Sequence, residues 1–117
     1  MVDLFAGCGG LSLGLEQAGF TPWFVNEIVE QFANTYKANH SLSDKHYFVG
    51  DIASLNEHIN DYKEMLDDIT LVCGGPPCQG FSMAGKRVED DVRNQLVFSY
   101  IKFIDLVRPR VILFENV

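Results

Sequence analysis

The feature that most constrains the fold is a regular alternation of strand-like and helix-like apolar segments along all 117 residues. Short apolar runs, typical of buried strands, alternate with stretches whose apolar residues recur every three or four positions, as on one face of a helix. Alternation of this kind favours a parallel sheet with right-handed crossovers. We therefore predict an α/β fold with a doubly wound, mainly parallel sheet. The predicted strands are residues 1–5, 23–25, 46–49, 69–73 and 111–114.

The predicted helices connect these strands. Leu11, Leu15 and Ala18 share one helical face, which ends at the stop signal Gly19. Residues 52–66 are mostly polar and predict one or two short helices. With no linker or repeat, the chain has the length of one domain, residues 1–117. The two remaining helices have apolar faces made by Val29, Phe32, Ala33 and Tyr36, and by Val97, Tyr100, Ile101, Ile104 and Val107.

Composition and charge limit the functional classes. The net charge of −7 argues against a free-standing nucleic-acid binder, which needs a basic face for phosphates. Either nucleic acid is not the substrate, or the basic surface lies outside these residues. No apolar run reaches the ~18 residues of a membrane span, and no signal peptide is recognised at residues 2–5. Cys8, Cys73 and Cys78 are an odd number at spacings unlike a disulfide framework, so we expect a reducing, intracellular setting.

In a doubly wound sheet, ligands bind outside the carboxyl ends of the strands, so the residues that follow each strand are the candidates. Gly7, Gly9 and Gly10 form a glycine-rich turn after the first strand, which allows the backbone to approach a ligand. Glu27 follows Gly7 by 20 residues, the separation at which an acidic residue holds a ribose hydroxyl in nucleotide-binding folds. A tight turn and a helix-capping glutamate are the structural alternatives.

The later strand ends carry three more polar candidates. Asp51 follows the third strand and can accept a hydrogen bond from an exocyclic amine, with Ile52 packing on the ring; an ordinary N-cap aspartate is the alternative. Cys78 lies on a proline-stiffened loop after the fourth strand, where a nucleophilic thiolate can be presented. Glu115 leaves the apolar fifth strand and is a candidate for proton chemistry, or simply an exposed carboxylate.

Three other ligand classes are disfavoured. Gly80, Gly85 and Lys86 nearly form a phosphate-binding P-loop, but Arg87 replaces the hydroxyl residue that holds magnesium. The dinucleotide fingerprint requires a third glycine where this chain has Ser12. No zinc-ligand spacing relates the cysteines to the histidines His40, His46 and His58.

Taken in order, these segments closely resemble successive motifs of the DNA cytosine-5 methyltransferases. The motifs are DLFAGCGG at residues 3–10, NEI at 26–28, GDI at 50–52, GGPPCQGFS at 74–82 and ENV at 115–117. The resemblance covers nearly the whole chain and is most specific at the Pro-Pro-Cys-Gln and Glu-Asn-Val segments. It implies a Rossmann-like methyltransferase fold, interrupted after the fifth strand before the target-recognition region.

The resemblance also implies a cofactor, S-adenosyl-L-methionine, which becomes S-adenosyl-L-homocysteine on transfer. Glu27 is expected to hold its ribose, Asp51 its adenine amine, and Ile28 and Ile52 the two faces of the adenine ring. The methionine end and one face of the adenosine are expected against the first loop, and two later positions resemble further contacts. These remaining implied cofactor contacts are Phe5, Gly7, Cys8, Gly9, Gly10, Pro77 and Leu96.

The implied reaction is methylation of carbon 5 of a flipped-out cytosine in double-stranded DNA. Cys78 is expected to add to carbon 6, and Glu115 to stabilise the charge that develops on the ring. The resemblance places the DNA-reading surface in a part that follows residue 117, which accounts for the acidic charge, and implies no metal and no membrane. Three alternatives stay open: methylation of cytosine in RNA, a non-catalytic cofactor-binding subunit that needs a second chain, and a nicotinamide-dependent oxidoreductase. The location is the cytoplasm for a bacterial protein and the nucleus for a eukaryotic one.

Overall fold

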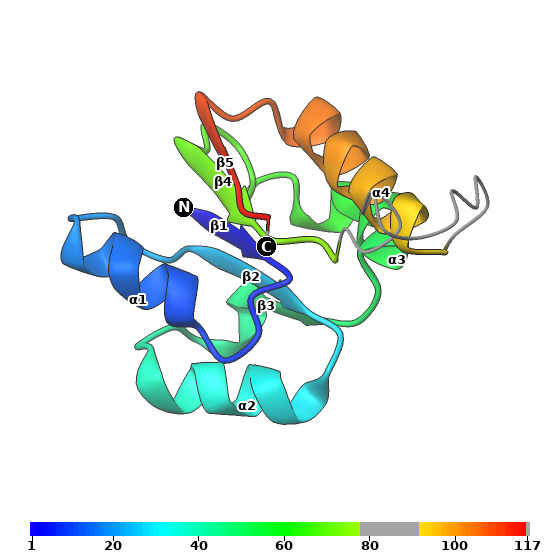
Figure 1. Ribbon diagram of the computed structural model, residues 1–117. Helices are drawn as coiled ribbons and strands as arrows, with labels where there is room; N and C mark the ends of the chain where they lie inside the picture. Colours follow the sequence, from blue (N-terminus) through cyan, green and yellow to red (C-terminus); the bar gives the residue numbers. More distant parts are fainter. Residues whose placement is uncertain (78–91, 117) are drawn as a thin grey trace.

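A five-stranded parallel sheet forms the centre of the computed structural model, which describes residues 1–77 and 92–116 (Figure 1). The strand order is β3-β2-β1-β4-β5, and every neighbouring pair is parallel. The direction of winding reverses at β1, so the predicted doubly wound sheet is confirmed. The strands are β1 (Val2–Leu4), β2 (Phe24–Glu27), β3 (Tyr47–Val49), β4 (Leu71–Gly74) and β5 (Val111–Phe114).

Helices cover both faces of the sheet (Figure 1). The two that follow β1 and β2 lie on one face, and the two that follow β3 and β4 lie on the other, as right-handed crossovers in opposite directions require. The α-helices are α1 (Gly10–Gln17), α2 (Glu30–Asn39), α3 (Ile52–Glu57) and α4 (Val92–Val107), with short 3-10 helices η1 (Asp44–His46) and η2 (Ile59–Tyr62).

The largest core cluster lies between the sheet and the α3–α4 layer. Alternate residues of a strand point to the same face, so Val2 and Leu4 of β1 share this cluster with neighbours on β2 and β4. Each fully buried side chain of this size contributes about 1.5–3 kcal/mol through removal from water. The buried members are Val2, Leu4, Phe24, Ile52, Leu55, Leu66, Ile69, Val72, Tyr100 and Phe103.

Two predicted helix faces differ from the observed ones. Phe32 and Ile101 were expected to be buried, but their side chains are 46% and 49% exposed. Ala33 and Tyr36 form the buried side of α2, and Phe103 joins Tyr100 in the core beneath α4. Periodicity identifies a helix and its approximate face, whereas the neighbouring layers decide which residues at the margin of that face are covered. Helix α4 begins at Val92, so it includes the polar residues that precede Val97, the first residue of the predicted apolar face.

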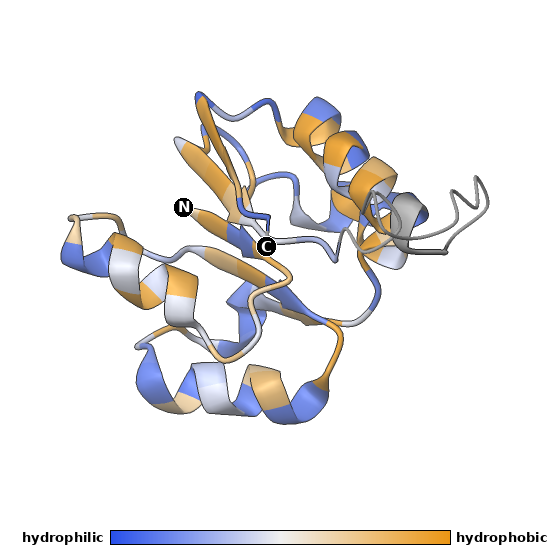
Figure 2. Ribbon diagram, viewed as in Figure 1, coloured by the Kyte–Doolittle hydropathy of each residue, from blue (hydrophilic) through white to orange (hydrophobic). Residues whose placement is uncertain are grey.

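Strand β5 forms one edge of the sheet and is apolar throughout (Figure 2). Its residues Val111–Phe114 pair with β4 on one side, and all four are exposed to solvent. An exposed apolar edge strand is a template for association. Within residues 1–77 and 92–116, no helix has both the length and the apolar character needed to cross a membrane.

Candidate functional site

One cavity, with a volume of about 350 Å³, lies where β1, β2 and β3 end. This volume is within the range of small-molecule sites, roughly 300–1,000 Å³. Eight of its lining residues are among the predicted cofactor contacts, and Asn26, Phe32 and Gly50 are additional. The residues that line the cavity are Phe5, Gly7, Asn26, Glu27, Ile28, Phe32, Gly50, Asp51, Ile52, Pro77 and Leu96.

The first wall of the cavity is the loop after β1. Phe5 adopts a left-handed backbone conformation with φ of 57°, which is uncommon for a bulky residue and is found mainly where a turn or a functional site requires it. Gly7 follows with φ of 55°, a conformation that glycine adopts without strain. These two left-handed residues, with Ala6 between them, turn the chain sharply away from β1, and both Phe5 and Gly7 line the cavity.

Glu27 joins the two loops that enclose this cavity. Its Oε2 accepts a hydrogen bond from the Gly7 N–H at 2.7 Å, and its Oε1 accepts one from the Val29 N–H at 2.8 Å. The side chain is 7% exposed and lies in the cavity wall. A carboxylate oxygen has two lone pairs, so each oxygen keeps the capacity to accept a further hydrogen bond. Glu27 is therefore a structural brace that keeps the capacity to accept a hydrogen bond from a ligand.

Asp51 lies across the cavity from the first loop, at the end of β3. Its Oδ1 caps α3 by accepting the Ala53 N–H at 2.8 Å, which is the structural alternative raised by the sequence. The cap occupies one of its two oxygens, and the residue is exposed, so a ligand amine can still reach the carboxylate. Ile52, the next residue, is 2% exposed and lines the cavity from the core side.

Asn26 holds the β2 and β3 walls of the cavity together. Its amide Nδ2 donates to the Phe48 carbonyl at 3.0 Å and to the Gly50 carbonyl at 2.8 Å, and the Gly50 N–H donates to the Glu27 carbonyl at 3.0 Å. These bonds fix the turn that carries Asp51. Asn26 and Gly50 were not among the predicted contacts, because their role depends on contacts between strands that a linear pattern does not show.

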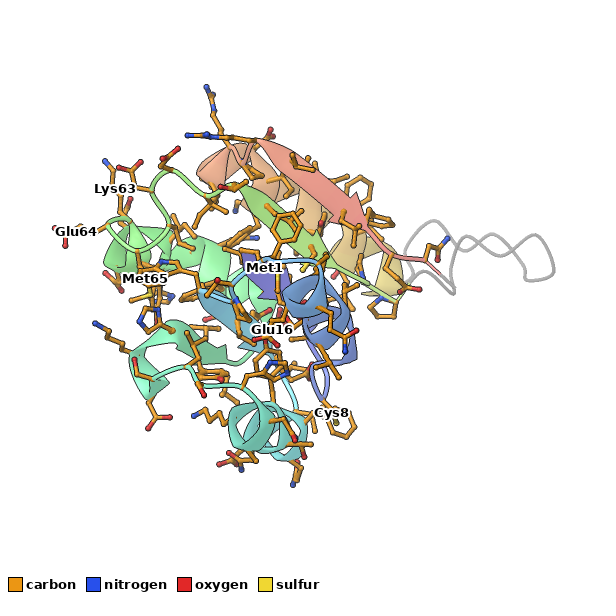
Figure 3. The ribbon with its side chains drawn as sticks, turned by 90° about the vertical axis from the view of Figure 1, so that its left-hand side faces the viewer. Met1, Cys8, Glu16, Lys63, Glu64 and Met65 are labelled. Atoms are coloured by element: carbon orange, nitrogen blue, oxygen red, sulfur yellow. The ribbon has the colours of Figure 1, made fainter. Side chains whose placement is uncertain are left out.

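Three predicted cofactor contacts do not line the cavity. Cys8 is exposed on the loop before α1, at the margin of the molecule (Figure 3). Gly9 is buried with φ of 93°, and a Cβ atom there would contact the His40 Nε2 atom and lie 2.9 Å from the Tyr36 ring. Gly10 is exposed at the first turn of α1. The structure thus gives Gly9 a packing role, and cofactor contact by these three residues stays a prediction.

A network of polar side chains packs against the loop after β1. We call it the Asp3 network, and its members are Asp3, Ser12, Glu16, Tyr36 and His40. The Asp3 Oδ2 atom accepts from the Ser12 hydroxyl at 2.7 Å, and the Ser12 oxygen accepts from the Tyr36 hydroxyl at 2.6 Å. The Tyr36 ring stacks on His40, whose Nδ1 lies 2.7 Å from the Glu16 Oε2 atom. Burial raises the pKa of the Asp3 carboxyl to about 6, because the ionised form loses its hydration. The five residues connect β1, α1 and the end of α2.

Glu115 lies beside the end of β4, where the Pro-Pro-Cys segment begins. Its N–H donates to the Gly74 carbonyl at 2.9 Å, which continues the β4–β5 pairing. Its side chain lies over Gly75, so that a Cβ atom on Gly75 would collide with the Glu115 Oε2 atom. Cys78, the predicted nucleophile, lies outside the described residues, and its position relative to Glu115 stays a prediction.

Comparisons with known proteins agree on one family. The model of the family described as "C-5 cytosine-specific DNA methylase" matches residues 1–117. Two similar relatives are type II methyltransferases. M.NgoPII of Neisseria gonorrhoeae is 44% identical over 100% of this chain and 33% of its own length. M1.HphI of Haemophilus parahaemolyticus is 40% identical over 99% of this chain and 32% of its own length. M.HgiGI of Herpetosiphon aurantiacus is 40% identical over 99% of this chain and 88% of its own length.

A solved structure supports the same assignment. The crystal structure of a protein described as a DNA modification methyltransferase encoded within an E. coli prophage matches with a TM-score of 0.78 and 38% identity, over 99% of this chain and 31% of that one. The chain thus spans about a third of that protein and of the first relatives named above. The match in sequence and fold over the entire chain shows that it belongs to the C-5 cytosine-specific DNA methylase family.

Proposed function

We propose that this chain supplies the cofactor-binding and catalytic part of an enzyme that transfers a methyl group from S-adenosylmethionine to carbon 5 of cytosine in DNA. The observation that carries the proposal is the cavity at the carboxyl ends of β1, β2 and β3, in which two carboxylates lie among apolar walls. The family is one of methylases, so a methyl donor is required. S-adenosylmethionine, when bound, supplies an electrophilic methyl group.

The residues of the cavity fit the nucleoside part of this cofactor. Ribose hydroxyls and an exocyclic amine are hydrogen-bond donors, and carboxylates are acceptors only, which suits Glu27 for the ribose and Asp51 for the amine. Ile28 and Ile52 offer apolar surface to the two faces of the base. Further contacts from Phe5, Gly7, Pro77 and Leu96 complete the enclosure. We assign the methionine end to the first loop, near Cys8, Gly9 and Gly10.

Two residues carry the chemistry on cytosine. The Cys78 thiolate adds to carbon 6 of the ring, which turns carbon 5 into a nucleophile that can accept the methyl group. Glu115 contacts ring nitrogen 3 and the exocyclic amine and stabilises the charge that develops during the addition. Carbon 5 then loses its proton to a base, and the electron pair of that bond expels the thiolate. The cytosine must be flipped out of the helix to reach these groups.

The proposed macromolecular partner is double-stranded DNA. The net charge of −7 gives this chain no excess of cations for phosphate contacts, so we place most of the DNA-reading surface in another part of the enzyme. Cytosine in RNA is the alternative substrate, since Cys78 and Glu115 would contact the same base in RNA as in DNA.

Covalent trapping tests the proposed reaction. A chimera in which this chain replaces the matching third of M.NgoPII is incubated with S-adenosylmethionine and DNA that carries 5-fluorocytosine in the M.NgoPII site. Fluorine cannot leave as the proton does, so we expect a stable protein–DNA adduct that the Cys78→Ala variant does not form. Undiminished adduct in Cys78→Ala would overturn the nucleophile assignment.

Binding to the chain alone tests the cofactor assignment separately. We expect calorimetry to show weak binding of S-adenosylhomocysteine, and a lower affinity in Glu27→Ala and in Asp51→Ala. Glu27 also braces Gly7 and Val29, so its variant is checked by circular dichroism before binding is compared. Tighter binding of NAD than of S-adenosylhomocysteine would contradict the assignment.

A further inference from the structure

Phe32 is an aromatic residue with a conspicuous position on α2. Its side chain lines the cavity although it is 46% exposed, and it lies at the margin of the helix face that Ala33 and Tyr36 bury. In the described part of the chain, its ring takes part in no stacked or edge-on pair with another ring, whereas the Tyr36, Phe24 and Tyr100 rings do. An exposed phenyl ring in a cavity wall gains from being covered by a planar apolar surface.

The position of Phe32 is fixed by the same carboxylate that we assign to the ribose. The Glu27 Oε1 atom holds the Val29 N–H, and the Val29 carbonyl accepts the Phe32 N–H at 3.0 Å. Val29 is the N-cap of α2, so Glu27 sets where the helix starts and Phe32 lies in its first turn. A ligand hydroxyl on Glu27 and a ring against Phe32 are therefore held in a defined relation, as the sugar and base of one nucleoside require.

The faces of a base in this cavity would contact apolar side chains, because the polar side chain of Asn26 is already hydrogen-bonded within the protein. The Asn26 amide donates to the Phe48 and Gly50 carbonyls, so it is engaged within the protein. Ile28 is 63% exposed and offers a branched aliphatic surface at the open side of the cavity. Aromatic rings stack on bases more favourably than aliphatic side chains do, because both surfaces are planar and polarisable.

We propose that Phe32 stacks on the adenine ring of the cofactor, on the face that the 63% exposed Ile28 covers only in part, opposite Ile52, and that it sets the preference of the cavity for a planar base. The proposal rests on the proposed function, because it takes the ligand of the cavity to be an adenosine derivative. Phe32 acts on the base alone, and Glu27 acts on the sugar. Substitution of Phe32 therefore affects every ligand that contains adenosine and leaves the contribution of the methionine end unchanged.

An NMR titration of the chain with S-adenosylhomocysteine and, separately, with adenosine tests this proposal. We expect Phe32→Ala to weaken both ligands by the same factor, about tenfold, which corresponds to about 1.4 kcal/mol. Phe32→Tyr keeps the ring and is expected to bind within about twofold of the parent chain. Phe98→Ala is the matched control, because Phe98 is 65% exposed on α4 and does not line the cavity.

A second readout separates stacking from a structural role. Nuclear Overhauser contacts between the Phe32 ring protons and the adenine ring protons are expected in the complex with the parent chain. Their absence, or unchanged affinity in Phe32→Ala, overturns the proposal while the cofactor assignment stands. If Phe32→Ala loses its folded spectrum, Phe32→Leu replaces it, with the same expected weakening. A parent chain that binds neither ligand overturns the cofactor assignment and this proposal together.

Discussion

The Glu115 carboxylate occupies the space that a side chain on Gly75 would fill. The preceding glycine has a different neighbour, because a Cβ atom on Gly74 would lie 2.5 Å from the Leu4 carbonyl oxygen of β1. Gly74 thus allows β1 and β4 to pack closely, and Gly75 allows Glu115 to lie over the start of the Pro-Pro-Cys segment. The absence of a side chain at Gly74 is therefore required for the sheet, and its absence at Gly75 is required for the position of the proposed catalytic carboxylate.

Gly75→Ala is expected to displace the Glu115 carboxylate while the chain remains folded. The methyl group meets the end of a flexible side chain, which can rotate away, so the expected loss of unfolding free energy is below about 1 kcal/mol. In the chimera with M.NgoPII, the rate of methyl transfer should fall about 10- to 100-fold, because the charge-stabilising group is no longer in place. Single-turnover kinetics with tritiated methyl donor measure this rate.

The control for this variant is Gly14→Ala on α1, where a Cβ atom would meet nothing within 4 Å. Its rate is expected to match the parent. A rate for Gly75→Ala that also matches the parent would show that Glu115 does not need its present position.

Burial of Asp3 predicts a specific pH dependence of stability. The carboxyl pKa is about 6 in the folded chain against an ordinary value of 3.8, so folding favours the protonated form. The resulting contribution to the free energy of unfolding is fully present below about pH 4 and is lost as the pH rises to about 6. This difference in pKa corresponds to about 3 kcal/mol.

Asp3→Asn is expected to remove this dependence, because the amide keeps an oxygen for the Ser12 hydroxyl and carries no charge. Urea unfolding of both chains at pH 4, 5, 6 and 7 measures it: the variant should gain stability relative to the parent across this range. Asp44→Asn is the control, since the Asp44 side chain is exposed and its ion pair with Lys37 is worth little. Parallel curves for parent and Asp3→Asn would contradict the assignment of the shift to Asp3.

Gly9→Ala is expected to destabilise the chain by at least about 2 kcal/mol. An L-residue at φ of 93° is strained, and its methyl group would collide with His40 and with the Tyr36 ring, both held in the Asp3 network. Gly10→Ala lies one residue later, has open space at its Cβ position and is expected to cost nothing. Chemical unfolding followed by the fluorescence of Trp23, the single tryptophan, compares the two. Equal midpoints would mean that the loop can relax around Gly9.

The strands, and the positions of the polar residues that follow them, were predictable from sequence, because both depend on local pattern. Apolar runs identified the parallel strands, and the order of motifs indicated where Glu27 and Asp51 would meet. The residues that hold the site in place were not predictable in the same way. The Asn26 amide donates to carbonyls on β3 and in the turn after it, and the hydrogen-bond partners of Ser12 are 9 and 24 residues away in sequence. Neither role can be predicted before the packing of the strands and helices is known.

The exposed strand β5 predicts self-association of the 117-residue chain. Val111–Phe114 present apolar side chains and unpaired backbone groups along one edge of the sheet, which can pair with the same edge of a second molecule. Ile112→Lys places a charge at the centre of this edge and is expected to lower association strongly, because pairing would bury the charge. Sedimentation velocity over a range of concentrations measures it. Leu13→Lys is the control, since Leu13 is equally exposed but lies on α1; equal association of the two variants would mean that the contact is made elsewhere.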